Sequence, residues 1–378
     1  MAIAGSIAFA GAVDPVPKIT VISRDFIYET AAFPSAHAST LVEATSGLVA
    51  AWFAGTAEKH PDVGIWVSSR NAREGGWSPP VEVANGVQPD GRRFPTWNPV
   101  LFAVPKGPLV LFYKVGPSPS EWWGMVTASE GVEAGLQQNV VEAGLQQDVV
   151  EAGLQPRVTW HVPRRLPDGI LGPIRAKPVL LDPVTMLAGS STEHDGWRAH
   201  MESLQIRARA FATSYLAVEE FLARAAKPAS WTKTPPLNTP REFSAIQPTI
   251  LVHSPKRLQI LCRTEQGVIA ESWSNDGGAT WSALKATSLP NPSAGIDVVK
   301  LASGLFVLAY NPSAENRRVM ALSTSKDGVA WSAPVTIEEG QGEYSYPAII
   351  QTHDGLVHMT YTWRRERIRH VVVKIDAE

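Results

Sequence analysis

The sequence holds a single cysteine, Cys262, among its 378 residues. An internal disulfide therefore cannot form, which excludes a small secreted scaffold held together by disulfides. An excess of charge of either sign is missing too, because 36 Asp and Glu stand against 34 Lys and Arg. A net charge of −2 gives no electrostatic basis for nucleic acid or an anionic membrane as a partner.

Long apolar runs are also missing, and none reaches the ~20 residues of a transmembrane helix. Residues 1–13 are small and apolar but lack the Lys or Arg that precedes the apolar part of a secretory signal. We therefore expect residues 1–22 to form a lead without regular structure. We also expect the protein to be cytoplasmic and monomeric.

Turn-forming residues and tryptophan are abundant. The 29 Gly and 30 Pro indicate many turns, and 13 Trp is a high number. Aromatic residues repeated at turns are typical of β-propellers. Tryptophans that precede a small polar residue occur at turn-like positions 77, 160, 231, 281 and 331, and the last three are 50 residues apart. A period near 50 fits a propeller blade of four strands.

Two insertions account for the longer gaps between the first tryptophans. Residues 132–158 are three tandem nonapeptides that begin VEAGLQ, without the alternation of a strand. Residues 204–230 contain a segment, 213–226, with apolar residues at helical spacing and Thr213 or Ser214 as a candidate cap. We expect a short surface helix there.

Short β-type runs lie between the tryptophan turns, at 48–53, 108–113, 257–262, 305–310 and 356–361. Strand, turn, strand and tryptophan turn form a unit, and six units fit the chain. The sequence thus predicts an all-β protein, a six-bladed β-propeller over residues 23–378 with two surface insertions. The N-terminal strand is expected to complete the last blade, which removes the open sheet edges.

The clearest motif is Ser-x-Asp-x-Gly-x-x-Trp. The stretch from Ser274 to Trp281 matches it fully, and the stretch from Ser325 to Trp331 is one residue short. The Asp carboxylate accepts backbone N–H groups across the turn, Gly permits positive φ, and the Trp ring covers the turn. This motif resembles the Asp-box, or BNR repeat, of the sialidase (neuraminidase) superfamily, and the resemblance extends from about Phe33 to Tyr361.

The resemblance implies an active site. Sialidases use a tyrosine nucleophile supported by a glutamate, an aspartate acid/base, and three arginines that bind the substrate carboxylate. Tyr344 resembles the nucleophile, since it stands in a Tyr-Ser pair before a strand. Asp62 resembles the acid/base, and Arg263 the second arginine. Arg317 or Arg318 resembles the third, and the sequence does not choose between them.

Two positions depart from the family pattern. His37 stands where sialidases have the first arginine, in an Arg-Ile-Pro segment. Gln247 stands where the supporting glutamate belongs, and an amide cannot accept the tyrosine proton. Glu343 or Glu242 is a candidate replacement for that glutamate.

Other polar and aromatic residues follow strand ends, which in a propeller surround the central mouth. Trp stacks on a sugar ring, and Lys and Arg bind carboxylates. Further candidates for substrate binding are Arg93, Lys114, Trp123, Glu193 and His194. The sequence shows no metal-ligand cluster and no Gly-rich phosphate loop, so no cofactor is expected.

Three functions follow as hypotheses, and each has a carbohydrate as partner. The first is a sialidase-like exo-glycosidase, a glycoside hydrolase acting on sialic acid or a related carboxylated sugar. The second is a hydrolase or lyase of uronic-acid polysaccharides that uses His37 or His194 with a tyrosine. The third is a carbohydrate-binding propeller without catalysis, which the two departures at His37 and Gln247 would explain.

Overall fold

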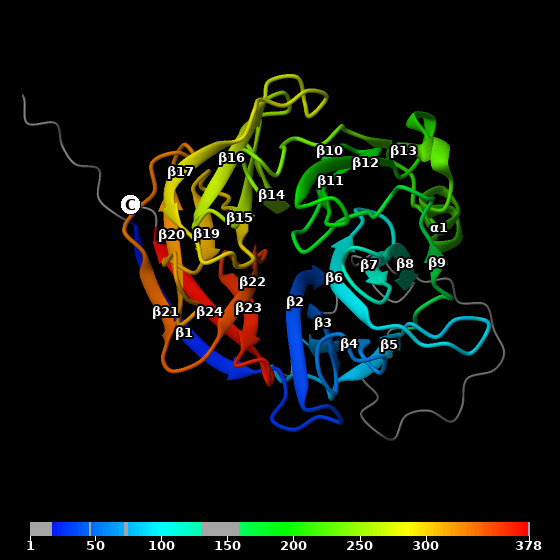
Figure 1. Ribbon diagram of the computed structural model, residues 1–378, viewed down its shortest axis with the longest axis horizontal. Coiled ribbons are helices and arrows are strands. Elements are labelled where there is room, and N and C mark those ends of the chain that lie inside the picture. The colour runs from blue at the N-terminus through cyan, green and yellow to red at the C-terminus, as the bar shows by residue number, and fades with distance from the viewer. Residues whose placement is uncertain (1–16, 45–46, 72–74, 130–158, 377–378) are drawn as a thin grey trace, which may run out of the picture.

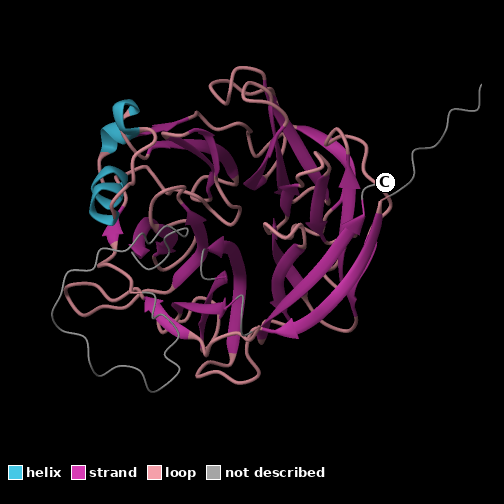
Figure 2. Ribbon diagram, turned by 180° about the vertical axis from the view of Figure 1, so that it is seen from behind, coloured by secondary structure: helices cyan, strands magenta, loops and turns pink. Residues whose placement is uncertain are grey.

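The protein consists of six four-stranded antiparallel sheets. Figures 1 and 2 show that the sheets form a ring around a central axis. The computed structural model describes residues 17–44, 47–71, 75–129 and 159–376. The prediction of a six-bladed β-propeller is confirmed. The nonapeptide insertion and the first part of the N-terminal lead lie outside these residues. No helix in the described ranges is long and apolar enough to cross a membrane.

The first three blades follow each other along the chain. Blade 1 comprises β2 (Ser35–Ala44), β3 (Gly47–Gly55), β4 (Gly64–Asn71) and β5 (Val81–Ala84). Blade 2 comprises β6 (Thr96–Ala103), β7 (Leu109–Val115), β8 (Trp123–Ser129) and β9 (Arg164–Arg165). Blade 3 comprises β10 (Val179–Asp182), β11 (Thr185–Thr192), β12 (Arg198–Gln205) and β13 (Trp231–Lys233).

The remaining blades complete the ring. Blade 4 comprises β14 (Ala245–Val252), β15 (Leu258–Thr264), β16 (Val268–Ser274) and β17 (Lys285–Pro290). Blade 5 comprises β18 (Asp297–Lys300), β19 (Phe306–Tyr310), β20 (Val319–Ser325) and β21 (Val335–Glu339). Blade 6 comprises β22 (Tyr344–Gln351), β23 (Val357–Trp363), β24 (Arg367–Asp376) and, as its outer strand, β1 (Lys18–Phe26).

Strand β1 joins the two ends of the chain. It pairs antiparallel with β24, from Lys18 opposite Asp376 to Phe26 opposite Arg369. The expected closure by the N-terminal strand is confirmed. The strand begins at Lys18, so the end of the expected lead, 18–22, belongs to the propeller.

The second insertion contains the helix α1 (Val218–Ala225), flanked by single 3-10 turns at Arg209–Phe211 and Pro228–Ser230. The helix is shorter than the predicted segment and begins after Ala217, without a side-chain cap, so the prediction of Thr213 or Ser214 as cap is wrong. The chain before it is held instead by Leu216 N, which donates to Lys106 O. Buried Phe221 and Leu222 pack the helix against blade 2.

The hydrophobic core lies between neighbouring blades. One cluster joins Val49 and Phe53 of blade 1 to Leu111 and Tyr113 of blade 2. Another joins Val307 of blade 5 to strands of blade 6. The second strands supply much of this core because both of their faces are covered by adjacent blades, which explains the nearly continuous apolar runs in the sequence.

Asp276 fixes the complete Asp-box turn. Its carboxylate accepts hydrogen bonds from Thr280 N at 2.9 Å and from Ser274 Oγ at 2.8 Å. Trp281 Nε1 donates to Gly278 O and closes the turn. The hydrogen bonds from the Thr280 hydroxyl and backbone lower the pKa of Asp276 to about 2. The turn therefore favours the ionised carboxylate.

Asp276→Ala is expected to lower the melting temperature at neutral pH, with a difference that shrinks in acid. The folded-state pKa lies below the unfolded value of about 3.9. The contribution of Asp276 is therefore full above pH ~4 and is lost as the pH falls toward about 2. Thermal unfolding of both proteins between pH 3 and 7 measures this, with exposed Asp168→Ala as the control. A difference that does not change with pH would contradict the role of the carboxylate.

Candidate active site

A repeated distortion of the first strands directs side chains toward the axis. In β2, β6, β14 and β22 the register with the second strand shifts at the same point, which is the mark of a β-bulge. A residue other than glycine has positive φ at each shift, and Arg175, just before β10, has the same conformation. These residues are Ala38, Asn98, Arg175, Gln247 and Tyr346. Such a backbone costs about 1–3 kcal/mol per residue and is typical of functional sites.

Tyr346 lies at the centre of a cluster of arginines. Arg263 Nη1 donates a hydrogen bond to the Tyr346 hydroxyl. The guanidinium carbons of Arg175, Arg263 and Arg317 are 5.4, 5.5 and 5.7 Å from the centre of the Tyr346 ring. Three blades thus direct cations at one phenol. We call Tyr346, Arg175, Arg263 and Arg317 the arginine cluster.

His37 packs on the same phenol. Its ring centre is 4.2 Å from that of Tyr346, and Phe53, Trp97 and Trp122 continue this row of aromatic rings. Burial lowers the pKa of His37 well below its usual value, and the charges of the surrounding arginines lower it further. His37 is therefore neutral at neutral pH and does not add to the positive charge of the cluster.

Glu343 balances part of that charge. Its carboxylate accepts hydrogen bonds from Arg317 Nη1 at 2.9 Å, Arg365 Nε at 2.9 Å and Ser345 Oγ at 2.6 Å. Burial acts to raise the pKa of Glu343, but the hydrogen bonds from Arg365 and Ser345 and the arginine charges outweigh it, so the pKa is lowered. Arg365 also contacts Glu58, which links blade 6 to blade 1.

Several buried polar atoms in the described part of the mouth have no hydrogen-bond partner. They include Nδ1 of His37, Nε and Nη2 of Arg175, Oε1 of Gln247 and Nε of Arg263. Buried polar groups are nearly always paired, so a concentration of unpaired ones at a single site is typical of a site that receives a polar ligand. Donors predominate here, which favours an anionic or oxygen-rich ligand.

A cavity of about 230 Å³ lies between blades 2 and 3, and Trp123, Glu193 and His194 line it. The Arg165 guanidinium is 5.2 Å from the Trp123 ring. Burial raises the pKa of Glu193, although the charge of Arg263 and a hydrogen bond with Trp197 oppose the rise. The Trp197 ring is itself 4.7 Å from the Arg263 guanidinium, so the cavity lies beside the arginine cluster.

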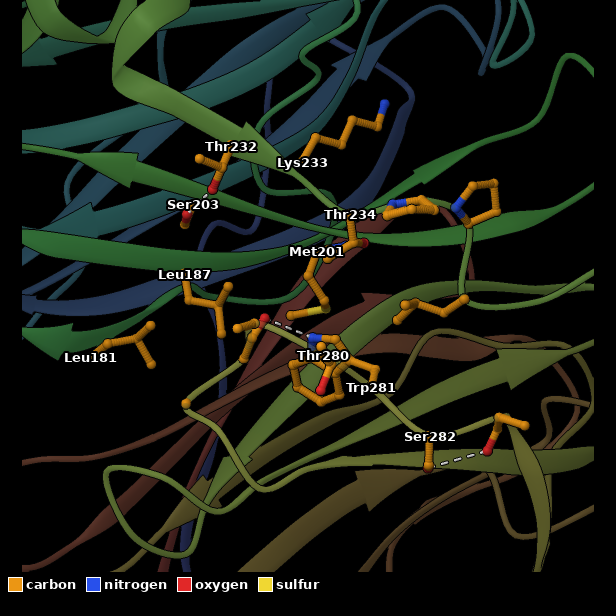
Figure 3. Close-up of a pocket in the computed structure, with 17 residues that line it drawn as sticks. Leu181, Leu187, Met201, Ser203, Thr232, Lys233, Thr234, Thr280, Trp281 and Ser282 are labelled. Carbon is orange, nitrogen blue, oxygen red and sulfur yellow. Dashed lines mark hydrogen bonds between the residues drawn. The ribbon is translucent and has the colours of Figure 1, made fainter.

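A larger cavity, about 640 Å³, lies between blades 3 and 4 at the Asp-box turn (Figure 3). Leu181, Leu187, Met201 and Trp281 form its apolar side. Its lining has no carboxyl side chain, and Lys233 is its one titratable residue. Such a lining cannot supply the acid and base that glycoside hydrolysis requires, so this cavity is not a candidate for that chemistry.

A sequence model of the BNR repeat-like domain matches residues 46–359, most of the chain. The protein belongs to the BNR repeat-like domain family. No curated protein matches it. Similar solved structures include a protein of unknown function from Dyadobacter fermentans, with a TM-score of 0.67 at 14% identity, covering 95% of this chain and 99% of that one.

Sialidases are among the structural neighbours of this BNR repeat-like protein. A Hadza microbial sialidase has a TM-score of 0.66 at 15% identity over 89% of this chain and 65% of its own. The sialidase of Trypanosoma rangeli, in complex with sialic acid, has a TM-score of 0.61 at 12% identity over 96% of this chain and 59% of its own. The protein is thus sialidase-like in fold, and it spans about three fifths of the trypanosomal chain.

The structure brings some of the residues named from the sequence together and keeps others apart. Arg263, Arg317, Glu343 and His37 meet around the mouth. Arg318, by contrast, is exposed, so the arginine cluster contains Arg317. Tyr344 lies in the hydrophobic core between blades 5 and 6, whereas Tyr346 is the tyrosine among the arginines. The nucleophile role expected for Tyr344 therefore has no support from this geometry.

Three other residues named from the sequence, Asp62, Arg93 and Lys114, make hydrogen bonds to other parts of the protein. Asp62 caps the turn between β3 and β4, where it accepts hydrogen bonds from Thr56. Burial acts to raise the pKa of Asp62, but the hydrogen bonds from Thr56 and the contact with His60 outweigh it, so the pKa is lowered. Arg93 holds the same turn by donating to Asp62 O at 2.8 Å. Lys114 is fully buried and donates to Pro173 O at 2.9 Å, between blades 2 and 3.

Sequence reasoning missed Tyr346, Arg175 and the role of Arg365. A signal for Tyr346 was present, because Asn98, Gln247 and Tyr346 are each followed by proline at the start of a first strand. The equivalence of these three dipeptides would have selected Tyr346. No comparable signal marks Arg175.

Proposed function

We propose that this sialidase-like protein is a glycoside hydrolase that acts on a carboxylated sugar such as sialic acid. The observation that carries the proposal is the arginine cluster, in which a tyrosine hydroxyl accepts a hydrogen bond from one guanidinium and two more lie within 6 Å of its ring. A guanidinium binds a carboxylate through two parallel hydrogen bonds. The same charges stabilise negative charge on the tyrosine oxygen.

In this proposal the Tyr346 oxygen attacks the anomeric carbon of the bound sugar, or stabilises the positive charge that develops there. A tyrosine nucleophile occurs in sialidases. Tyr346 has no carboxylate partner among the described residues, and Gln247 occupies the nearby bulge of blade 4. The arginine cations stabilise the phenolate in place of a carboxylate, and the phenol proton passes to neutral His37, whose buried Nδ1 has no hydrogen-bond partner and whose ring centre is 4.2 Å from that of Tyr346.

The leaving oxygen requires a proton, and Glu193 is the better candidate to supply it. Its carboxyl lines the 230 Å³ cavity beside Arg263, and burial raises its pKa. Asp62 has a lowered pKa and is held by Thr56 and His60, which favours a permanently ionised group. A general acid works best when its pKa lies near the operating pH.

The test is hydrolysis of 4-methylumbelliferyl N-acetylneuraminic acid across pH 4 to 8. We expect fluorescence release that declines as Glu193 loses its proton, and Glu193→Gln should lower kcat by about 10²- to 10⁴-fold and remove that decline. Asp62→Asn is the matched variant and should retain the pH profile. A loss confined to Asp62→Asn would return the acid role to Asp62, and no turnover of any acidic glycoside would refute the proposal.

A second candidate, a lyase of uronic-acid polysaccharides, has one supporting observation. Neutral His37 lies 4.2 Å from Tyr346, ring centre to ring centre. A histidine and a tyrosine so placed are a base and an acid suited to removing the proton beside a carboxylate and protonating the leaving oxygen. Ultraviolet absorbance of an unsaturated product from uronide polymers would favour this candidate, and hydrolysis without it would exclude it.

A further inference from the structure

Two histidines of blade 6 are buried against each other. His358 lies in β23, and His370 lies in the neighbouring strand β24. His358 Nδ1 and His370 Nε2 are 3.0 Å apart, and the planes of the two rings differ by only 13°. His370 is 0% exposed and His358 is 7% exposed. One ring therefore donates a hydrogen bond to the other, which requires that the accepting ring be neutral. We call these two residues the histidine pair.

The histidine pair packs against blade 1. The ring of Trp77 in blade 1 meets the ring of His370 edge-on, with 5.2 Å between the ring centres. Trp77 also packs on the hydrophobic cluster that joins Trp52 of blade 1 to Ile350 of blade 6. We call this contact between blades 6 and 1 the seam. Since β24 also pairs with β1, the seam lies where the two ends of the chain complete the ring.

A cavity of about 870 Å³ lies at the seam, and His358 is part of its lining. The lining also includes Glu43 and Arg70 of blade 1 and His353 and Asp354 of blade 6. Glu43 stands at the end of β2 remote from the bulge of that strand, so this cavity is on the face of the ring opposite the mouth. Protons from the solvent can therefore reach the histidine pair through His358.

The surroundings of the histidine pair disfavour its protonation. Burial, the neighbouring His358 and the charge of Arg70 lower the pKa of His370 to about 3. Burial also lowers the pKa of His358, and Arg70 adds to this effect, although the charges of Asp354 and Glu43 oppose it. Both rings are therefore neutral at neutral pH.

The acids near the histidine pair are engaged elsewhere. Glu43 accepts a hydrogen bond from His353 N at 3.0 Å, and Asp354 accepts from a hydroxyl and a backbone N–H of its own turn. Asp25 lies opposite His370 in β1, but it is exposed and is not among the charges that shift the pKa of His370. Among the described residues, Nδ1 of His370 has no hydrogen-bond partner. An added proton there would be a buried charge without an acceptor, which is costly.

We propose that the histidine pair is an acid-sensitive switch that holds blades 6 and 1 together. While both rings are neutral, they pack against Trp77 and the seam stays closed. When the pair takes up protons, the seam opens before the other blades unfold. This inference goes beyond the proposed function and does not depend on it, because it involves neither the mouth nor a sugar.

The direction of the pH dependence follows from the pKa values. A histidine in the unfolded chain has a pKa near 6.5. Because the folded histidine pair has lower pKa values, the unfolded chain binds more protons in acid. The contribution of the pair to stability is therefore full above pH ~6.5 and is lost as the pH falls below that value.

The first experiment compares thermal unfolding of the wild-type protein with that of the double variant His358→Gln and His370→Gln, whose side chains form hydrogen bonds but do not titrate. From pH 7 to pH 5 the wild-type melting temperature should fall by roughly 5 °C more than that of the double variant. His353→Gln is the control, because it removes an exposed histidine of the same cavity whose pKa is raised by Glu43. It should keep the wild-type fall.

The second experiment locates the opening in the wild-type protein. Hydrogen–deuterium exchange is measured at pH 7 and pH 5 and corrected for the intrinsic exchange rates. Peptides that cover β24 and Trp77 should exchange faster at pH 5 by about 10-fold or more, while β15 of blade 4 keeps its protection. Exchange of the imidazole C2 hydrogens, measured by mass spectrometry, gives the pKa of each histidine without any substitution.

Each outcome decides for or against the switch. If the melting temperature of the double variant falls as much as that of the wild type, the histidine pair does not hold the seam. If β24 and β15 lose protection together, protonation weakens the whole ring and the seam does not open first. If the double variant does not fold, the wild-type protein still decides: early exchange at the seam with lowered pKa values for both histidines supports the switch, and a pKa near 6.5 for either overturns it.

Discussion

Tyr346→Phe is expected to lower kcat on an acidic glycoside by roughly 10³-fold or more, because it removes the oxygen proposed to react. The phenyl ring remains, so contacts with His37 and the arginines through the ring persist. KM should change much less than kcat if the hydroxyl acts in the transition state and not in substrate binding. Steady-state kinetics with the fluorogenic sialoside measures both quantities.

Tyr344→Phe is the matched control. The Tyr344 side chain packs in the core between blades 5 and 6, and its hydroxyl makes no hydrogen bond within the part of the chain that the structure covers. We expect its kcat to stay within about twofold of wild type, as for a change that leaves the reacting groups in place. If Tyr346→Phe keeps full activity and Tyr344→Phe loses activity, the nucleophile is Tyr344 and not Tyr346.

The second large effect concerns stability and the buried carboxylate of Asp297 in blade 5. It accepts hydrogen bonds from Lys177 Nζ at 2.8 Å, Thr249 Oγ1 at 3.0 Å and Ile349 N at 3.0 Å. These donors belong to blades 3, 4 and 6. One side chain therefore ties four of the six blades together near the axis.

Asp297→Ala is expected to destabilise the protein by about 3–5 kcal/mol, the range for removing one partner of a buried ion pair. The loss leaves the Thr249 hydroxyl and the Ile349 amide without this acceptor, and it leaves the Lys177 ammonium with Val298 O alone. For a chain of this length that corresponds to a fall in melting temperature of roughly 5 °C. Calorimetric unfolding measures the change.

Two further variants test whether the buried contacts of Asp297 cause the loss of stability. Asp297→Asn keeps the shape and one acceptor oxygen, so its loss should be smaller than that of Asp297→Ala. Asp168→Ala removes a carboxylate that is 93% exposed and pairs with Arg165, and it should change the melting temperature little. Equal losses for Asp297→Ala and Asp168→Ala would show that the buried contacts do not hold the blades together.

The fold was predictable because its signals are local and repeated. Trp231, Trp281 and Trp331 recur at the blade period, and the Asp-box that begins at Ser274 closes its turn with its own side chains. Strands such as β3 and β19 are apolar over most of their length because neighbouring blades cover both faces. None of these signals depends on residues far away in the sequence.

The site was less predictable because it depends on how far-apart blades meet. In a regular strand Tyr344 and Tyr346 would share a face. The bulge at Tyr346 breaks the alternation, which sends one ring to the axis and leaves the other in the core. Arg175 lies beside a strand of four residues, without a motif, and it reaches Tyr346 only through the curvature of the ring.

The bulges with positive φ have a consequence for how such proteins diversify. Blades 1, 2, 3, 4 and 6 each present one side chain at an equivalent point around the axis, from Ala38 to Tyr346. A functional group can then be relocated by point substitutions in two blades, without rebuilding any backbone. Two propellers are therefore best compared by the residues at the same structural position of each blade, whichever blade holds them. An arginine absent from one blade should accordingly be sought at the same position of the other five.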